Sequence, residues 1–424
     1  MKKYFSPRIG LAYRLTSSLV VRSGYSISYD PYSMARPLLS NYPEQINQSV
    51  SAPNTMQPAG RLVDGIPTVP TPDLNTATLP VSLTVGITTS PKNYDRGYIQ
   101  SWNLTLQKQF AGGIVGQAAY VGNSGIRLRA ASDVNFGQLG GGTASEPLVQ
   151  KFGRTAGTSV IQPLGYTRYH ALQLTADRRF SNGFQLKASY TFSKAIALCC
   201  GDGYDPSPGI KIPQYYTLNR ALAPSDRTHA FTLLSIYELP FGKGRPWLKS
   251  GGVLSAVAGG WQLNALITRY SGSPFSVSAS GTSLNAPGST QRADQVKANV
   301  AILGGHGPGE PYFDPLAFAP VTDVRFGTAG FYTLRGPGLF NADLGLFRQL
   351  SIKDRWKVQL RAEAFNFVNT PNFGNPGSNV SNLQLNDDGS VRSLSGFTEI
   401  TSMNSTSREG LAERTIQFGI RVTF

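Results

Sequence analysis

Apolar and polar residues alternate with a period of two along many segments of the chain. In the last ten residues the apolar set is Ile416, Phe418, Ile420, Val422 and Phe424, and the positions between them hold Gln417, Gly419, Arg421 and Thr423. The same alternation occurs at 101–110 and 184–193. Because successive side chains of a β-strand point to opposite faces, this period indicates strands with one apolar and one polar face. The pattern predicts an all-β protein.

Eleven segments of this kind can be placed, at about 5–15, 18–29, 96–110, 113–123, 167–180, 183–194, 226–240, 260–271, 338–351, 355–368 and 411–424. Many have ten residues or more, whereas strands of soluble proteins usually have about five or six. A tilted strand of about 9–11 residues is long enough to cross a bilayer. No run approaches the roughly 18 to 20 apolar residues of a transmembrane helix.

The connections between these segments alternate in length. Short or medium ones fall at Thr16-Ser17, Ala111-Gly112, Ser181-Asn182, 241–259 and Lys353-Asp354. Long ones fall at 30–95, 124–166, 195–225, 272–337 and 369–410. Barrels of the bacterial outer membrane have short periplasmic turns and long extracellular loops, whereas soluble sandwiches do not sort their loops by length. The sequence predicts a transmembrane antiparallel β-barrel with long extracellular loops.

Composition agrees with a membrane barrel. Charged residues make up 15% of the chain, below the roughly 25% of an ordinary soluble domain. The hydrophobic share of 40% is too high for a disordered chain. The net charge of +15 comes from scattered Lys and Arg rather than from a basic stripe, so we expect no nucleic-acid partner. Aromatic residues near strand ends predict girdles at the two membrane interfaces: Trp102, Phe110, Phe180, Phe184, Trp261, Trp356 and Phe424.

The order of the strands predicts an incomplete barrel. With the long loops outside, both the first and the last strand run inward, whereas single-chain bacterial barrels have an even strand count. The residues after Met1, Lys2 and Lys3 do not form the apolar core of a signal peptide. We therefore expect residues 1–424 to be the C-terminal part of a longer protein. The expected structure is an open curved sheet, or a smaller barrel in which 5–15 closes onto 411–424.

Four segments together resemble a known family: Asp226-Arg227-Thr228-His229-Ala230-Phe231, Tyr237-Glu238-Leu239-Pro240-Phe241-Gly242, the run 361–376 with Val368-Asn369-Thr370-Pro371-Asn372-Phe373-Gly374, and the terminal 414–424. The chain resembles the Oar-like TonB-dependent receptors of acidobacterial type, which often carry a carboxypeptidase-regulatory-like domain. This resemblance implies a 22-stranded barrel with an N-terminal plug, of which the chain is the second half, about 11 strands. The plug and the N-terminal strands are absent from it.

The resemblance also implies function and partners. It implies energy-coupled uptake of a small nutrient, such as a siderophore or an oligosaccharide, with TonB acting through the missing plug. The surroundings would be outer-membrane lipid and lipopolysaccharide. The terminal strand, with Ile416, Phe418, Ile420, Val422 and Phe424, resembles the signal read by the barrel assembly machinery, although a last lipid-facing strand needs the same alternation. The alternative function is a surface, adhesion or organising protein that displays long loops without transport.

The long loops carry candidate ligand contacts. Tyrosine and arginine at Tyr32, Tyr94, Arg96, Tyr215 and Tyr216 suit capture of a sugar or siderophore. Tyr is equally suited to the membrane interface or to loop packing, because its ring is apolar and its hydroxyl is polar. Both interpretations stay open.

Catalytic and metal-binding motifs are not apparent. The chain has three histidines, and two of them, His170 and His229, fall within predicted strands. His229 shares parity with Phe231 and Leu233, which predicts a role in the interface belt or in packing. No nucleophile elbow, zinc-protease motif or P-loop occurs, so we expect neither an enzyme nor a cofactor. The adjacent Cys199 and Cys200 are compatible with two loop thiols, a vicinal disulfide or, least readily, a metal site.

Overall fold

The structure is a computed structural model. It describes residues 4–29, 56–65, 85–89, 93–198, 207–352, 356–404 and 413–424, with 52, 68, 73, 75, 83 and 91 as single residues. Tyr32, Cys199, Cys200 and the predicted turn Lys353-Asp354 lie outside the described residues.

One large sheet of thirteen strands dominates the molecule. Eleven of them follow one another in chain order, each antiparallel to the next: β1 (Arg8–Arg14), β2 (Leu19–Tyr29), β4 (Tyr98–Gln109), β5 (Ile114–Asp133), β6 (Thr158–Ser181), β7 (Phe184–Leu198), β9 (His229–Glu238), β10 (Trp261–Tyr270), β15 (Leu339–Ile352), β16 (Trp356–Phe365) and β19 (Thr415–Thr423). Short β3 (Ile87–Thr89) pairs parallel to β6, and β8 (Arg220–Leu222) pairs antiparallel to β7. All eleven predicted strands are confirmed.

Strands β5 and β6 are longer than predicted. The sequence placed their facing ends at 123 and 167, but β5 continues to Asp133 and β6 begins at Thr158. Irregular pairing between Gly125 and Ala130 explains the error. Arg127 there has a φ of 53°, and such a bulge interrupts the period-two pattern on which the prediction relied.

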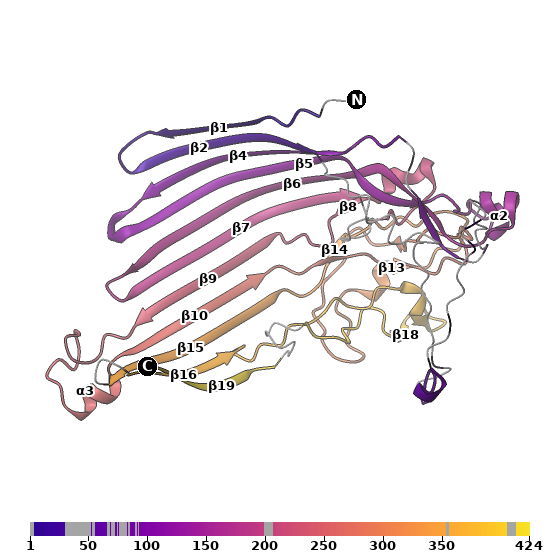
Figure 1. The fold of residues 1–424 in the computed structure, drawn as a ribbon. Coiled ribbons are helices and arrows are strands. Elements are labelled where there is room, and N and C mark those ends of the chain that lie inside the picture. Colours follow the sequence, from indigo (N-terminus) through magenta and orange to yellow (C-terminus); the bar gives the residue numbers. More distant parts are fainter. Residues whose placement is uncertain are drawn as a thin grey trace.

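The sheet is curved and open (Figure 1). Within the described residues, β1 pairs with β2 alone and β19 with β16 alone, so the two do not close a barrel. This confirms the expected open sheet. The long connections gather at one end of the strands, the loop end, and the short or medium ones at the other, the turn end. Both β1 and β19 run from the loop end toward the turn end.

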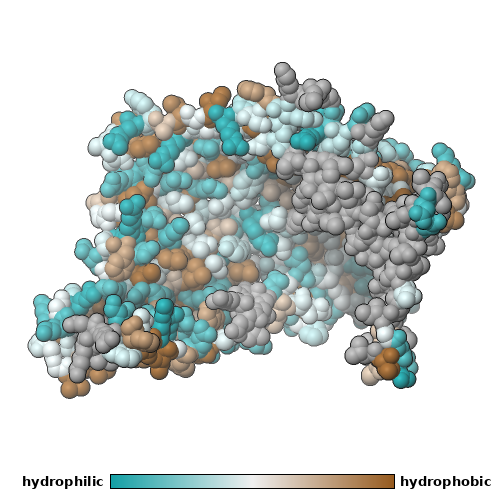
Figure 2. Space-filling view, viewed as in Figure 1, coloured by the Kyte–Doolittle hydropathy of each residue, from teal (hydrophilic) through white to brown (hydrophobic). Residues whose placement is uncertain are grey.

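Strand register keeps the two faces distinct. Leu104, Tyr120, Leu172 and Phe192 are successive partners across β4, β5, β6 and β7, on what we call the apolar face. On the opposite, polar face the corresponding row is Gln107, Gln117, Thr175 and Ser189. Figure 2 looks into the hollow of the sheet, where teal and white residues prevail. On the apolar face Leu104, Tyr120, Leu172 and Phe192 are all exposed, as a lipid-facing surface requires.

Described parts of the long connections, at 134–157, 207–228, 271–338 and 366–404, pack together into a compact body that we call the loop body. It contains the two-stranded sheets β11 (Pro274–Phe275) with β14 (Leu334–Arg335), β12 (Asp294–Gln295) with β13 (Phe318–Ala319), and β17 (Gln384–Leu385) with β18 (Val391–Ser393). The α-helices are α2 (Pro147–Phe152) at the loop end and α3 (Val253–Ala258) at the turn end. The 3₁₀ helices are η1 (Leu62–Asp64), η3 (Ala111–Gly113), η4 (Thr143–Ser145), η5 (Pro213–Asn219), η6 (Pro315–Ala317) and η7 (Val380–Asn382). Among the described helices, none is long and apolar enough to span a membrane.

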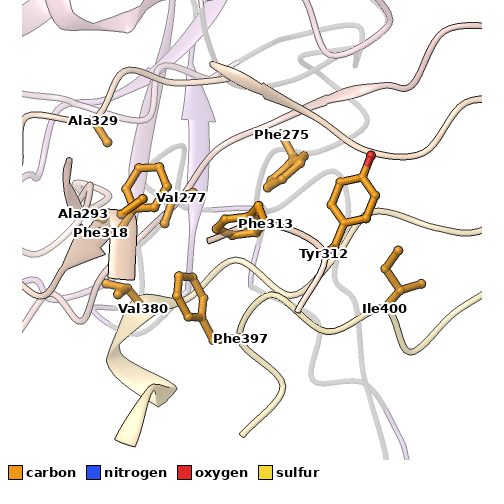
Figure 3. Close-up of a cluster of buried hydrophobic side chains, with 11 residues drawn as sticks. Phe275, Val277, Ala293, Tyr312, Phe313, Phe318, Ala329, Val380, Phe397 and Ile400 are labelled. Atoms are coloured by element: carbon orange, nitrogen blue, oxygen red, sulfur yellow. The ribbon is translucent and has the colours of Figure 1, made fainter. Parts of the chain in front are cut away.

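The loop body has its own hydrophobic core (Figure 3). Phe313 is fully buried at its centre, with ring centroids 5.7 Å from Phe275, 5.4 Å from Phe397 and 5.9 Å from Phe318. These residues come from the connections 271–338 and 366–414, so two loops far apart in sequence share one core. A shared core gives the loops a fixed shape, because each side chain is held by the other loop.

Candidate functional site: the loop body and the apolar face

Asp226 fixes the loop body to the sheet. Its side chain is fully buried, and one carboxylate oxygen accepts a hydrogen bond of 2.6 Å from the backbone N–H of Ala195 in β7. The other oxygen accepts from the Arg335 guanidinium, which also donates to the Gly272 carbonyl over 3.1 Å. A buried carboxylate requires such pairing. Asp226 therefore joins the wall of the sheet to the loop 271–338.

Two asparagines anchor the loop 366–414. Asn366 has a φ of 48° and is held by a side-chain hydrogen bond of 3.0 Å from the Thr370 N–H. Its own N–H donates to the Asp343 carboxylate over 2.9 Å. Asn372 accepts a hydrogen bond of 2.9 Å from the Phe340 N–H in β15, and both asparagines are buried. The motif after β16 is thus a turn that the amide side chains of Asn366 and Asn372 stabilise. Asn suits the position of Asn366, because it tolerates the left-handed backbone conformation.

Two arginines inside the loop body have defined partners. Arg325 binds Asp294 through two parallel hydrogen bonds of 2.8 and 2.7 Å, and these bonds lower the pKa of Asp294. Arg292 is buried, donates to the Gly327 carbonyl over 2.7 Å and lies 5.7 Å from the Phe331 ring. Burial lowers the pKa of Arg292. These contacts hold residues 292–294 against residues 325–331.

The predicted ligand residues fall into two groups. The Arg96 guanidinium lies 5.6 Å from the Tyr4 ring, which continues into an aromatic series with Tyr29 at 4.9 Å and then Tyr98 at 5.8 Å. Tyr94 lies two residues before Arg96 in the sequence and is half-buried. The Tyr215 ring packs edge-on against Phe326 at 5.3 Å, and the Tyr216 hydroxyl lies 2.9 Å from the Ser132 hydroxyl. The contacts of Arg96, Tyr215 and Tyr216 are of the packing type that the sequence left open as an alternative.

A pocket of about 650 Å³ lies at the loop end between β5, β6, β8 and η5. Its lining includes Tyr166, Arg168 and Arg220, with apolar walls from Ile126 and Leu198. Sequence reasoning missed this pocket because Tyr166 and Arg220 fall in 124–166 and 195–225, which were expected to be loops, and because Arg168 was not singled out within the predicted strand 167–180. One signal could have identified the site: Arg168 is a charged residue on the same strand face as the apolar Leu172 and Leu174.

The turn end of the apolar face carries an aromatic girdle. Three cations each lie over an aromatic ring: Lys108 over Phe110 at 5.4 Å, Arg178 over Phe184 at 5.1 Å and Arg348 over Trp261 at 5.5 Å. Trp356 and Phe424 continue the girdle with ring centroids 5.2 Å apart. An amphipathic ring beside a long cationic side chain is typical of a membrane–water interface.

A second aromatic group lies nearer the loop end of the apolar face. The Tyr120 hydroxyl lies 2.8 Å from Nδ1 of His170, and the Tyr190 hydroxyl lies 2.8 Å from Nδ1 of His229. Trp102 lies over Gly122, where an added Cβ would come within 2.5 Å of the indole. The His229 ring also lies 5.2 Å from Phe192, a contact that fits either the belt or the packing role that the sequence predicts.

The terminal strand lies on the same apolar face. Ile416, Phe418, Ile420 and Val422 pair with Ala364, Ala362, Leu360 and Val358 of β16. Phe418 is 83% exposed and Phe424 is 86% exposed. The strand therefore presents its apolar set to the surroundings, as the sequence pattern predicts. Its role as an assembly signal stays a prediction.

Within the residues that the structure describes, no group of three or more His, Cys, Asp or Glu side chains could hold a metal ion.

A family model described as "Outer membrane beta barrel domain" matches residues 1–417. No curated protein sequence matches the chain. Among solved structures, the outer membrane transporter YddB from Escherichia coli superposes with a TM-score of 0.49 at 10% identity, over 98% of this chain and 40% of that one. The FrpB iron transporter from Neisseria meningitidis (F3-3 variant) superposes with a TM-score of 0.43 at 10% identity, over 98% of this chain and 38% of that one. The chain spans 40% or less of the length of these two proteins. The family match over nearly the whole sequence shows that the chain belongs to the outer-membrane β-barrel domain family and that its place is the outer membrane.

Proposed function

We propose that the chain forms part of the barrel and the external loops of an Oar-like TonB-dependent receptor, which takes up a small nutrient across the outer membrane. The observation that carries this proposal is structural: two of the segments that resemble this family attach the loop body to the sheet. Asp226 of the first segment and Asn366 and Asn372 of the third are the residues that join the loop body to the sheet. The resemblance therefore lies in the machinery that presents the loops, which is where a receptor binds its ligand.

We further propose that β1 and β19 pair with additional strands in a barrel of 22, with a plug that TonB acts upon. An unpaired strand edge in lipid leaves backbone groups without partners, at a cost of several kcal/mol for each group. Pairing of β1 with β19 would be parallel, because both run from the loop end to the turn end. An odd number of further strands gives each edge an antiparallel neighbour instead.

In this proposal the nutrient binds at the loop end. Tyr32, Tyr94, Arg96, Tyr215 and Tyr216 stay the candidate contacts, and a siderophore or an oligosaccharide is the candidate ligand class. Aromatic rings bind sugar and catechol faces, and Arg adds a charge for anionic groups. The core around Phe313 supports this role, because a loop body of fixed shape loses little conformational entropy when a ligand binds.

Gene deletion in the native host tests the proposal. Uptake of radiolabelled ferric siderophores and growth on a panel of oligosaccharides are compared among the parent, the deletion strain, the complemented strain and a strain that lacks TonB. We expect one uptake activity to be lost in both mutants and restored by complementation. Unchanged uptake together with altered cell adhesion would instead favour a surface-organising protein.

A further inference from the structure

Three basic residues form a cluster on the apolar face near the loop end: Arg168 of β6, Lys194 of β7 and Arg220 of β8. Lys194 pairs with His170 and Arg168 pairs with Ile196, so the two cations are diagonal neighbours across adjacent strands, about 7 Å apart by sheet geometry. Arg220 pairs with Leu198 and shares the pocket of about 650 Å³ with Arg168. All three side chains are exposed.

Among the residues that the structure describes, no acidic side chain compensates the charges of this cluster. Within the described residues, none of the three side chains makes a salt bridge or a side-chain hydrogen bond. At the turn end, by contrast, Lys108, Arg178 and Arg348 each lie over an aromatic ring. Three neighbouring cations without acidic partners attract a multiply charged anion.

The distance of the cluster from the turn-end girdle, measured along the strands, indicates which layer of the membrane surrounds that anion. Lys194 lies ten residues after Phe184 of the turn-end girdle. At about 3.3 Å per residue and a tilt of about 40°, this separation is about 25 Å along the barrel axis. The apolar band of an outer-membrane barrel is also about 25 Å tall. The cluster therefore lies at the level of the outer-leaflet headgroups, and Leu172 and Phe192 lie below it on the same face.

We propose that Arg168, Lys194 and Arg220 bind the phosphates of the outer-leaflet glycolipid, lipopolysaccharide. Its phosphorylated sugars would contact the three cations and the pocket walls at Ile126 and Leu198, and its acyl chains would lie along Leu172 and Phe192. A free nutrient anion fits less well, because the cluster continues into the apolar face. This inference rests on the outer-membrane location and is independent of the transported nutrient.

The test uses the natural gene product, extracted from outer membranes in mild detergent. Native mass spectrometry measures its affinity for bisphosphorylated lipid A, for dephosphorylated lipid A and for bisphosphorylated lipid A in millimolar inorganic phosphate. The variant combines Arg168→Gln, Lys194→Gln and Arg220→Gln, and the matched control combines Lys108→Gln, Arg178→Gln and Arg348→Gln at the turn end. Heat-modifiable electrophoretic mobility confirms that both variants are folded.

We expect the loop-end variant to bind bisphosphorylated lipid A on the order of a hundredfold more weakly, and the control variant to bind it as the parent does. The parent should bind dephosphorylated lipid A weakly, and inorganic phosphate should not compete. Equal affinity of the parent and the loop-end variant, or equal affinity for both lipids, would overturn the proposal. Full competition by inorganic phosphate would assign the cluster to a free anion and would also overturn it.

Discussion

At the scale of single residues, the loop body depends on a few buried polar groups. Asp226 and Asn372 connect it to the sheet, and Asp294 of β12 holds the segment that follows β13 through its hydrogen bonds with Arg325. Such groups stabilise a structure only while every partner is present, because an unpaired buried charge is costly. Their substitution should therefore loosen the loops and leave the strands intact.

Replacing Asp226 with alanine should open the loop body. The change leaves Arg335 and the Ala195 N–H without their acceptor, at a cost of about 3 kcal/mol, which corresponds to roughly a hundredfold more of the open form. Protease cleavage within 272–337 should accelerate by that factor. The control is Lys297→Ala, which breaks the exposed ion pair with Asp314 and should cost less than about 1 kcal/mol. Equal acceleration in both variants would contradict this role of Asp226.

The Asp294–Arg325 pair should make the loop body sensitive to acid. Hydrogen bonds from Arg325 lower the pKa of Asp294, so the carboxylate stabilises the folded loop above its ordinary pKa of about 3.9. That stabilisation is lost as the pH falls through the lowered folded-state pKa. Hydrogen exchange of β12 amides, corrected for intrinsic rates, should accelerate in this acidic range. Asp294→Asn should remove the pH dependence, and an unchanged dependence in that variant would argue against the pair.

At the scale of the elements, alternation along each strand decides which substitutions the protein tolerates. Leu104 of β4 lies on the apolar face and Asn103 on the polar face, next to each other near the middle of the strand. The two positions have the same backbone environment and differ only in the face they present. They are therefore a matched pair for a test of membrane insertion.

Leu104→Arg should cost roughly 2–4 kcal/mol, because it places a charge at the middle of the lipid-facing surface. Asn103→Arg places the same charge on the polar face and should cost much less. Urea unfolding in lipid vesicles, followed by electrophoretic mobility, gives both free energies of unfolding. A similar loss in the two variants would show that the apolar face does not contact lipid.

The terminal strand allows a second test at this scale. If β19 is the signal for barrel assembly, Phe424→Ser should lower the amount of folded protein in the outer membrane several-fold. Trp356→Ala removes the same ring contact from the other side and leaves the terminal strand unchanged. An equal loss in the two variants would mean that the ring contact, rather than a signal, is what matters.

The strands could be predicted from the sequence because each one carries its own pattern. The extensions of β5 and β6 could not, since the irregular pairing around Arg127 breaks the period of two. The core of the loop body was also beyond prediction, because Phe313 and Phe397 come from different loops and have no local pattern. The basic cluster was missed for the same reason, since Arg168 and Arg220 meet only when β6 and β8 both lie beside β7.

At the scale of the whole molecule, the fold is a curved wall with a folded body of loops at one end. Within the described residues, the wall has an apolar face bordered by aromatic residues and an edge strand at each side, β1 and β19. In the proposed receptor these two edges pair with further strands, because unpaired backbone groups in lipid are costly. Its two ends differ in kind. The turn end carries short or medium connections and the cation–ring pairs, and the loop end carries the loop body and the basic cluster.

The sidedness of these ends is the central claim, and labelling in intact cells tests it most directly. Cys199 and Cys200 are first replaced by serine, and single cysteines are introduced by Thr322→Cys in the loop body and Ser250→Cys at the turn end, both exposed positions. A membrane-impermeant maleimide should label the Thr322→Cys variant in intact cells and the Ser250→Cys variant only after the outer membrane is opened. Labelling of Ser250→Cys alone in intact cells would contradict the orientation, and labelling of both would contradict a barrel that spans the membrane.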